Sequence, residues 1–92
     1  MDSAPHPDEE WTALRETPVA ELLAADILQL LRVAAAHLAT EPPDLSSARL
    51  AIDAAGAVIA AGDDRLGEHL ALYRQALAEA QRVFVHVSHP TD

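Results

Sequence analysis

The strongest constraint on the fold is a heptad repeat of apolar side chains in the last third of the chain. Its positions are Leu66, Leu70, Tyr73, Leu77, Ala80, Phe84 and Val87. Alternating steps of four and three residues place these side chains along one side of an α-helix. The spacing predicts a helix over about 65–87 that packs lengthwise against another helix. Asp63 or Asp64 is its expected N-cap, because acidic groups suit the positive end of the helix dipole.

A second helix is predicted over about 18–40. Thr17 is the expected N-cap, and Pro18 suits the first helical position, where no backbone donor is lost. Pro42 cannot continue a helix and restricts the residue before it, so the helix should stop shortly before it. The apolar side of this helix is formed by Val19, Leu22, Leu23, Ile27, Leu30, Ala34 and Leu38.

A third helix is predicted over about 45–61. Asp44 is its expected N-cap, and Gly62 its expected stop in a left-handed conformation. The apolar side is formed by Leu45, Ala48, Ile52, Ala55 and Ile59. Gly56 lies in the interior of this helix, where a glycine costs about 1 kcal/mol relative to alanine. We therefore expect the backbone of another helix to approach Gly56 closely.

The same stretch, "AIDAAGAVIAAGDD" over 51–64, superficially resembles a glycine-rich phosphate loop. A P-loop requires a lysine after its last glycine, and the chain contains no lysine. A dinucleotide fingerprint requires three glycines at set spacing after a strand, and neither condition holds. The stretch is therefore predicted to be architectural.

These patterns predict an all-α fold, since no segment has the alternation typical of a strand. We expect a three-helix domain over 17–87 with antiparallel helices, in which the helices over 18–40 and 65–87 pair lengthwise and the helix over 45–61 packs across them. A flexible acidic tail over 1–16 and a flexible end over 88–92 should flank it. Trp11 and Leu14 lie three residues apart in the tail, so one helical turn could dock them on the domain, or the tail could remain mobile.

Charge and composition restrict the possible partners. The formal net charge is −9, with 15 acidic residues against 6 arginines. Such a balance disfavours binding to nucleic acid or to an anionic membrane. No uninterrupted apolar run is long enough to span a membrane, and the acidic start is unlike a signal peptide, so we expect a cytoplasmic protein. There is no cysteine, which excludes disulfides and thiolate metal sites.

Surplus apolar residues predict self-association. Leu28, Leu50, Val58 and Val83 lie off the main apolar stripes, beyond what three helices need to bury. We expect a homodimer or another protein partner. Candidate interface or packing residues are Asp26, Leu28, His37, Gly56, Val58 and Tyr73. If the 18–40 helices of two copies pair antiparallel, Asp26 of one copy could meet His37 of the other. Alternatively, both side chains reach water at the rim of the apolar stripe.

The sequence contains no convincing catalytic pattern, so we predict a non-enzymatic protein without cofactor or metal. His86 and His89 are three residues apart, but a metal site needs further converging ligands. Asp44-Leu45-Ser46 reverses the Asp-Ser-Leu order of acyl carriers. A pocket between helices, weakly similar to that of small helical chorismate mutases, stays open as an alternative. It would need convergence among Arg15, Asp26, Arg32, His37 and Tyr73. A second alternative is an acidic inhibitor or antitoxin of a basic protein.

The pattern as a whole resembles a short bacterial family, the domain-of-unknown-function family numbered 1844, in its actinobacterial form. The resemblance covers 19–87 and rests on three segments: "VAELLAADILQLLRVAAAHLA", "DLSSARLAIDAAGAVI" and "LGEHLALYRQALAEAQRVF". It implies a small helical domain without established enzymatic activity, and it transfers no functional residues. Together with the surplus apolar residues, it favours a protein-interaction or self-assembly module.

Overall fold

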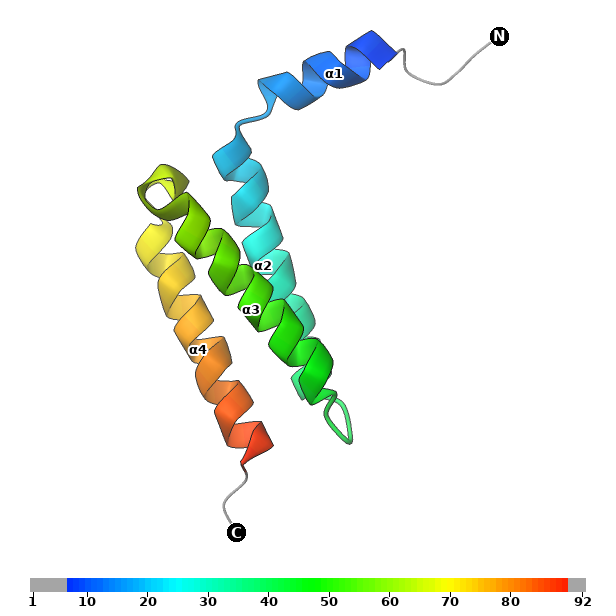
Figure 1. The fold of residues 1–92 in the computed structure, drawn as a ribbon, viewed down its shortest axis with the longest axis vertical. Helices are drawn as coiled ribbons and strands as arrows, with labels where there is room; N and C mark the ends of the chain where they lie inside the picture. Colours follow the sequence, from blue (N-terminus) through cyan, green and yellow to red (C-terminus); the bar gives the residue numbers. More distant parts are fainter. Residues whose placement is uncertain (1–6, 90–92) are drawn as a thin grey trace, which may run out of the picture.

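The computed structural model describes residues 7–89 (Figure 1). Within this range the chain forms α-helices and one 3-10 helix, and no strand. The elements are α1 (Pro7–Glu16), α2 (Val19–Leu38), α3 (Leu45–Gly62), the 3-10 helix η1 (Asp63–Leu66) and α4 (Leu70–Ser88). The all-α prediction is confirmed, but the described range contains four α-helices where we expected three.

The additional helix is α1, which lies in the segment expected to be a flexible tail. Proline at its first position and three acidic residues in its first turn suit a helix N-terminus. Figure 1 shows α1 pointing away from the other helices, and it packs against none of them. The helix over 7–16 was not predicted beyond a possible single turn at Trp11 and Leu14, and residues 1–6 lie outside the described range.

α2 begins at Val19, one residue later than predicted. Its N-cap is Pro18, not Thr17. The hydroxyl of Thr17 donates to the Ala13 carbonyl at 3.0 Å, so this side chain closes α1 and does not cap α2. α2 ends at Leu38, two residues before the predicted end.

The start of α3 agrees with the prediction. The Asp44 carboxylate accepts a hydrogen bond from the Ser47 amide at 3.1 Å, as an N-cap does. The turn before it is closed by the Asp44 amide, which donates to the His37 carbonyl at 3.0 Å. The peptide bond between Glu41 and Pro42 is cis.

The connection between α3 and α4 differs from the prediction. Gly62 is right-handed (φ −75°) and belongs to α3, whereas Asp63 carries the positive φ of 46°. Neither Asp63 nor Asp64 caps the following helix, because Gly67 (φ 88°) breaks the helical conformation and α4 starts only at Leu70. His69 is the N-cap residue of α4 and makes no side-chain cap bond. The predicted continuous helix from 65 is thus a 3-10 turn, a break and a shorter helix.

α2, α3 and α4 lie alongside one another, each reversing the direction of the one before it (Figure 1). α2 also contacts α4. The predicted packing of α3 across these two helices is wrong, because α3 lies alongside them (Figure 1), and α2 and α3 share the most extensive contact. The reason is the small size of the residues that α3 buries, since alanine lets two helix backbones come close. Those residues include Ala48, Ala51 and Ala55.

The core consists of two clusters along these helices. Ile27, Ile59, Leu66 and Tyr73 form the first cluster, and Ala34, Ala51 and Ile52 form the second. Leu77 packs against both clusters, and Phe84 against the second. The heptad positions of α4 from Leu70 to Phe84 therefore face the core as predicted, while Leu66 reaches it from η1.

Candidate functional site

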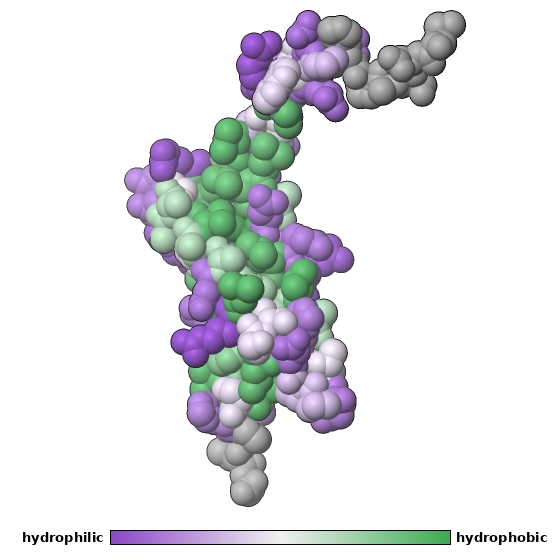
Figure 2. All heavy atoms as spheres, turned by 45° about the vertical axis from the view of Figure 1, so that its right-hand side comes forward, coloured by the Kyte–Doolittle hydropathy of each residue, from purple (hydrophilic) through white to green (hydrophobic). Residues whose placement is uncertain are grey.

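The feature of this structure that most resembles a functional surface is a set of exposed apolar side chains. Figure 2 shows hydrophobic atoms extending over one face of the molecule, in its upper half below α1. The exposed large apolar residues on the three packed helices are Val19, Leu22, Leu28, Val33, Leu50, Leu72, Val83 and Val85. Four of these eight lie on α2, which makes α2 the helix with the most apolar surface left uncovered.

Helical spacing places three of the α2 residues on one side. Val19, Leu22 and Val33 are separated by three and eleven residues, close to one and three turns. Their exposed fractions are 66, 43 and 36 %. We call these three side chains the α2 row. Asp26 falls within the row, one turn after Leu22, and is exposed. Leu28 is also exposed but lies on the opposite side of the helix.

A groove of about 300 Å³ adjoins the row where α2 begins and α3 ends. It is lined by Val19, Ala20, Leu23, Ala61, Gly62, Arg65 and Leu66. Most of its lining is apolar, and Arg65 supplies the one charged side chain among these residues. The Arg65 guanidinium donates to the Ala61 carbonyl at 2.7 Å, which holds it beside the groove. We call this feature the α2–α3 groove.

Trp11 and Leu14 do not dock on the other helices, which was one of the two alternatives for the N-terminal segment. Both belong to α1, and they are 65 and 59 % exposed. They lie three residues apart on one side of that helix, as the sequence indicated, but no other helix covers them. Arg15 follows them and donates to the Thr12 hydroxyl at 3.3 Å within α1.

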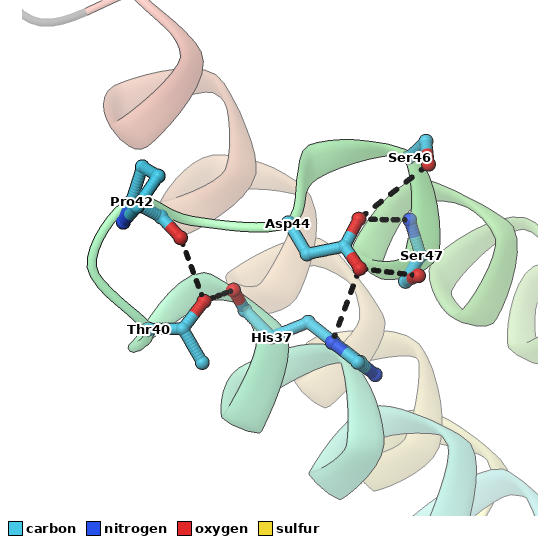
Figure 3. Close-up of polar contacts among 6 residues, drawn as sticks. All are labelled: His37, Thr40, Pro42, Asp44, Ser46 and Ser47. Atoms are coloured by element: carbon cyan, nitrogen blue, oxygen red, sulfur yellow. Dashed lines mark hydrogen bonds and ion pairs between the residues drawn. The ribbon is translucent and has the colours of Figure 1, made fainter.

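The most connected polar cluster lies at the turn between α2 and α3 (Figure 3). One oxygen of the Asp44 carboxylate accepts from the Ser47 hydroxyl at 2.7 Å and lies 3.7 Å from Nδ1 of His37. The other accepts from the Ser47 amide at 3.1 Å and from the Ser46 hydroxyl at 3.5 Å. The Thr40 hydroxyl lies between the carbonyls of His37 and Pro42, at 2.9 and 3.0 Å.

This cluster is unlike a nucleophile–base arrangement. In a catalytic triad the histidine stands between serine and carboxylate, whereas here the carboxylate stands between Ser47 and His37. The Ser47 hydroxyl and amide hold the pKa of Asp44 below its ordinary value of 3.8, so the carboxylate is a weak base. The geometry is that of a helix cap which also ties the end of α2 to the start of α3.

The cap gives a prediction about pH. Because the folded state lowers the pKa of Asp44, its stabilising effect is complete above pH 3.8 and is lost as the pH falls through the lowered value. Asp44→Ala should lower the melting temperature at neutral pH, and Asp44→Asn, which keeps a cap acceptor, should lower it less. Thermal unfolding should then depend less on acid pH in Asp44→Asn than in the wild type. Identical profiles for the two proteins would contradict this role.

The predicted interface and packing residues lie in three different environments. Asp26 and Leu28 are exposed on different sides of α2, and His37 is half-buried beside Asp44. Val58 is half-buried against the first core cluster. Tyr73 is buried in that cluster, with the His69 ring edge-on at 6.4 Å. Pairing of Asp26 with His37 of a second copy stays a prediction, but His37 already has a partner in its own chain, which sequence spacing did not indicate.

The expectation for Gly56 is corrected. A Cβ atom at this position would lie 3.5 Å from Cδ2 of Leu77, at ordinary contact distance. The neighbour is therefore a side chain of α4 and not the backbone of another helix. The close contact belongs instead to Gly62, where a Cβ would lie 2.5 Å from Cγ of Leu66.

The residues that a small-molecule pocket would require do not converge. Arg15 lies on α1, which contacts no other helix, whereas Tyr73 is buried in the core. Arg32 is exposed on α2. Over 7–89, no three or more acidic or histidine side chains cluster in a way that could hold a metal ion. His86 and His89 are exposed, and Asp92 lies outside the described residues.

One segment meets the length and hydropathy criteria for a membrane span. Leu45–Leu66 has a mean hydropathy of 1.3, and 33 % of it is buried within the structure. Arg49 and Asp53 interrupt it and lie 3.8 Å apart on its exposed side, while its apolar side packs against α2 and α4. The cytoplasmic location and the absence of membrane binding stay predictions.

Comparison with known proteins adds no functional assignment. The resemblance to the family numbered 1844 stays a prediction, because no family model, no curated protein and no solved structure matches this chain.

Proposed function

We propose that this protein is a non-catalytic module that assembles with itself, as a dimer in which a second copy covers the α2 row. Its folded unit is then an antiparallel three-helix bundle made of α2, α3 and α4. The observation that carries the proposal is the exposure of Val19, Leu22 and Val33 on one side of α2, a helix whose other side contributes Ile27, Ala34 and Leu38 to the core. Apolar side chains that are exposed together on one side of a helix are typical of surfaces that bind another protein.

Chain size supports the same conclusion. A chain of 92 residues buries a smaller fraction of its surface than a larger domain, so burial between copies is a substantial gain. The net charge of −9 favours a protein surface over nucleic acid as partner. Association of copies that share this charge has to rest on apolar contact, because their long-range electrostatic interaction is repulsive.

Asp26 limits how two copies can meet. It lies within the α2 row and has no hydrogen bond or ion pair among the described residues. An unpaired carboxylate is costly to bury. A dimer must therefore keep Asp26 at its rim or pair it with a cation of the second copy, and most registers of one α2 row on another are disfavoured.

Sedimentation velocity on the wild type and on Leu22→Glu tests the proposal. We expect the wild type to dimerise in the micromolar range and Leu22→Glu to raise the dissociation constant at least about tenfold, a change of about 1.4 kcal/mol. Ala78→Glu is the matched control, since it adds the same charge at an exposed site of α4 and should leave the constant unchanged. A wild type that stays monomeric at all concentrations would refute self-assembly.

A further inference from the structure

α1 has the properties of a helix that binds another surface. It has ten residues, and an isolated helix of that length is marginal in water even with favourable residues. One side carries Trp11 and Leu14, whose rings and methyl groups are exposed, while acidic residues fill its first turn. A short helix with one apolar side gains most of its stability from packing that side against a partner.

The α2–α3 groove has matching properties. Its lining is largely apolar, and it has a volume of about 300 Å³. Val19 and Ala20 of this lining stand at the start of α2, the end of that helix to which α1 is joined (Figure 1). Charge is complementary as well. α1 carries Asp8, Glu9, Glu10 and Glu16 against Arg15, a net charge of −3, and the groove presents Arg65.

The connection between α1 and α2 keeps Trp11 out of the groove of its own chain. Thr17 continues the hydrogen bonding of α1, through its amide and hydroxyl to the Ala13 carbonyl. The Pro18 carbonyl accepts from the amides of Glu21 and Leu22 in the first turn of α2, so no residue between the two helices is free of hydrogen bonds to one of them. The groove begins at Val19 itself, directly after Pro18. Trp11 precedes Val19 by eight residues, about 12 Å of helix, and α1 points away from the other helices (Figure 1).

We propose that α1 of one copy docks on a second copy, with Trp11 in the α2–α3 groove of that copy and the acidic first turn toward its Arg65. This inference rests on the self-assembly proposed above and names the segment that completes it. Val19 belongs to both the α2 row and the groove, so the docked helix extends the same interface. The exchange of α1 between copies also explains why no other helix among the described residues packs against α1 within one chain.

Trp11 is the only tryptophan of the chain, so its fluorescence reports directly on its burial. For the full chain, we expect the emission maximum to shift to the blue as concentration rises, with the same midpoint as dimerisation in sedimentation velocity. Ala61→Glu places a carboxylate in the groove and should raise the dissociation constant at least about tenfold and hold the emission at its dilute position. Ala60→Glu is the matched control, because Ala60 is exposed and lies outside the groove lining.

The other outcomes separate the two proposals. A blue-shifted emission that does not change with concentration would mean docking within one chain and would overturn the exchange of α1. Dimers in which Trp11 emission stays at the exposed position would also overturn it, while leaving self-assembly through the α2 row intact. Absence of dimers at every concentration would refute self-assembly itself.

Discussion

Ile27→Ala is expected to lower the free energy of unfolding by about 2–5 kcal/mol, which is the usual cost of removing a fully buried isoleucine. Ile27 is the one large side chain with no exposed surface among the described residues, and it joins α2 to Ile59 of α3 and Tyr73 of α4. A chain of 92 residues has a total stability of about 5–14 kcal/mol, so this loss removes a large part of it.

Leu28→Ala is the matched control for Ile27→Ala. Leu28 is the next residue of the same helix and is 48 % exposed, so its truncation should cost about 1 kcal/mol or less. Both variants should be unfolded in urea at the lowest practical concentration, so that association does not contribute to the stability. Equal midpoints for the two variants would show that Ile27 is not the centre of the core.

The two helical glycines should respond to alanine in opposite directions. At Gly62 the new Cβ would lie 2.5 Å from Cγ and 2.7 Å from Cδ2 of Leu66. Leu66 is itself buried, with only 6 % of its surface exposed. Cγ is attached close to the backbone and cannot move away alone. Gly62→Ala should therefore destabilise the fold by about 1–3 kcal/mol through overpacking.

Gly56→Ala provides the comparison. Its Cβ would contact Cδ2 of Leu77 at an ordinary 3.5 Å, and alanine is the better residue in a helix interior by about 1 kcal/mol. We expect this variant to unfold at a higher urea concentration than the wild type. If both substitutions shifted the midpoint in the same direction, the packing around the end of α3 would differ from the one described.

The sequence predicts α2, α3 and α4, but not the helix α1, most helix ends or the pairing of the helices. Asp44 was identified as an N-cap because cap residues act within one turn. The break at Gly67 was not predicted, because the heptad spacing continues across it. In the structure, Gly67 has a positive φ of 88° and separates η1 from α4. The preference of α2 for α3 depends on the summed size of many alanines and is not visible in any one spacing.

The sequence predicts exposed apolar residues but not the α2 row. Leu28 and Leu50 are exposed as expected, because an apolar stripe has a fixed width on a helix, whereas Val19 and Leu22 are exposed although they belong to the predicted stripe. The α2–α3 groove was missed, since it depends on where the start of α2 meets the end of α3. The contact of His37 with Asp44 was missed for the same reason: it spans a turn whose geometry no helical periodicity specifies.

Asp63 shows what fixes the direction of α4. A residue with a side chain at φ 46° and ψ −131° holds a strained backbone conformation, at a cost of about 1–3 kcal/mol. The Asp63 carboxylate accepts from the Arg74 guanidinium at 2.6 Å, but this pair is exposed and is worth at most about 1 kcal/mol. Burial of Leu66 beneath Gly62 contributes about 1.5–3 kcal/mol. The reversal of the chain is thus maintained by an apolar side chain three residues further on, and the visible ion pair is secondary.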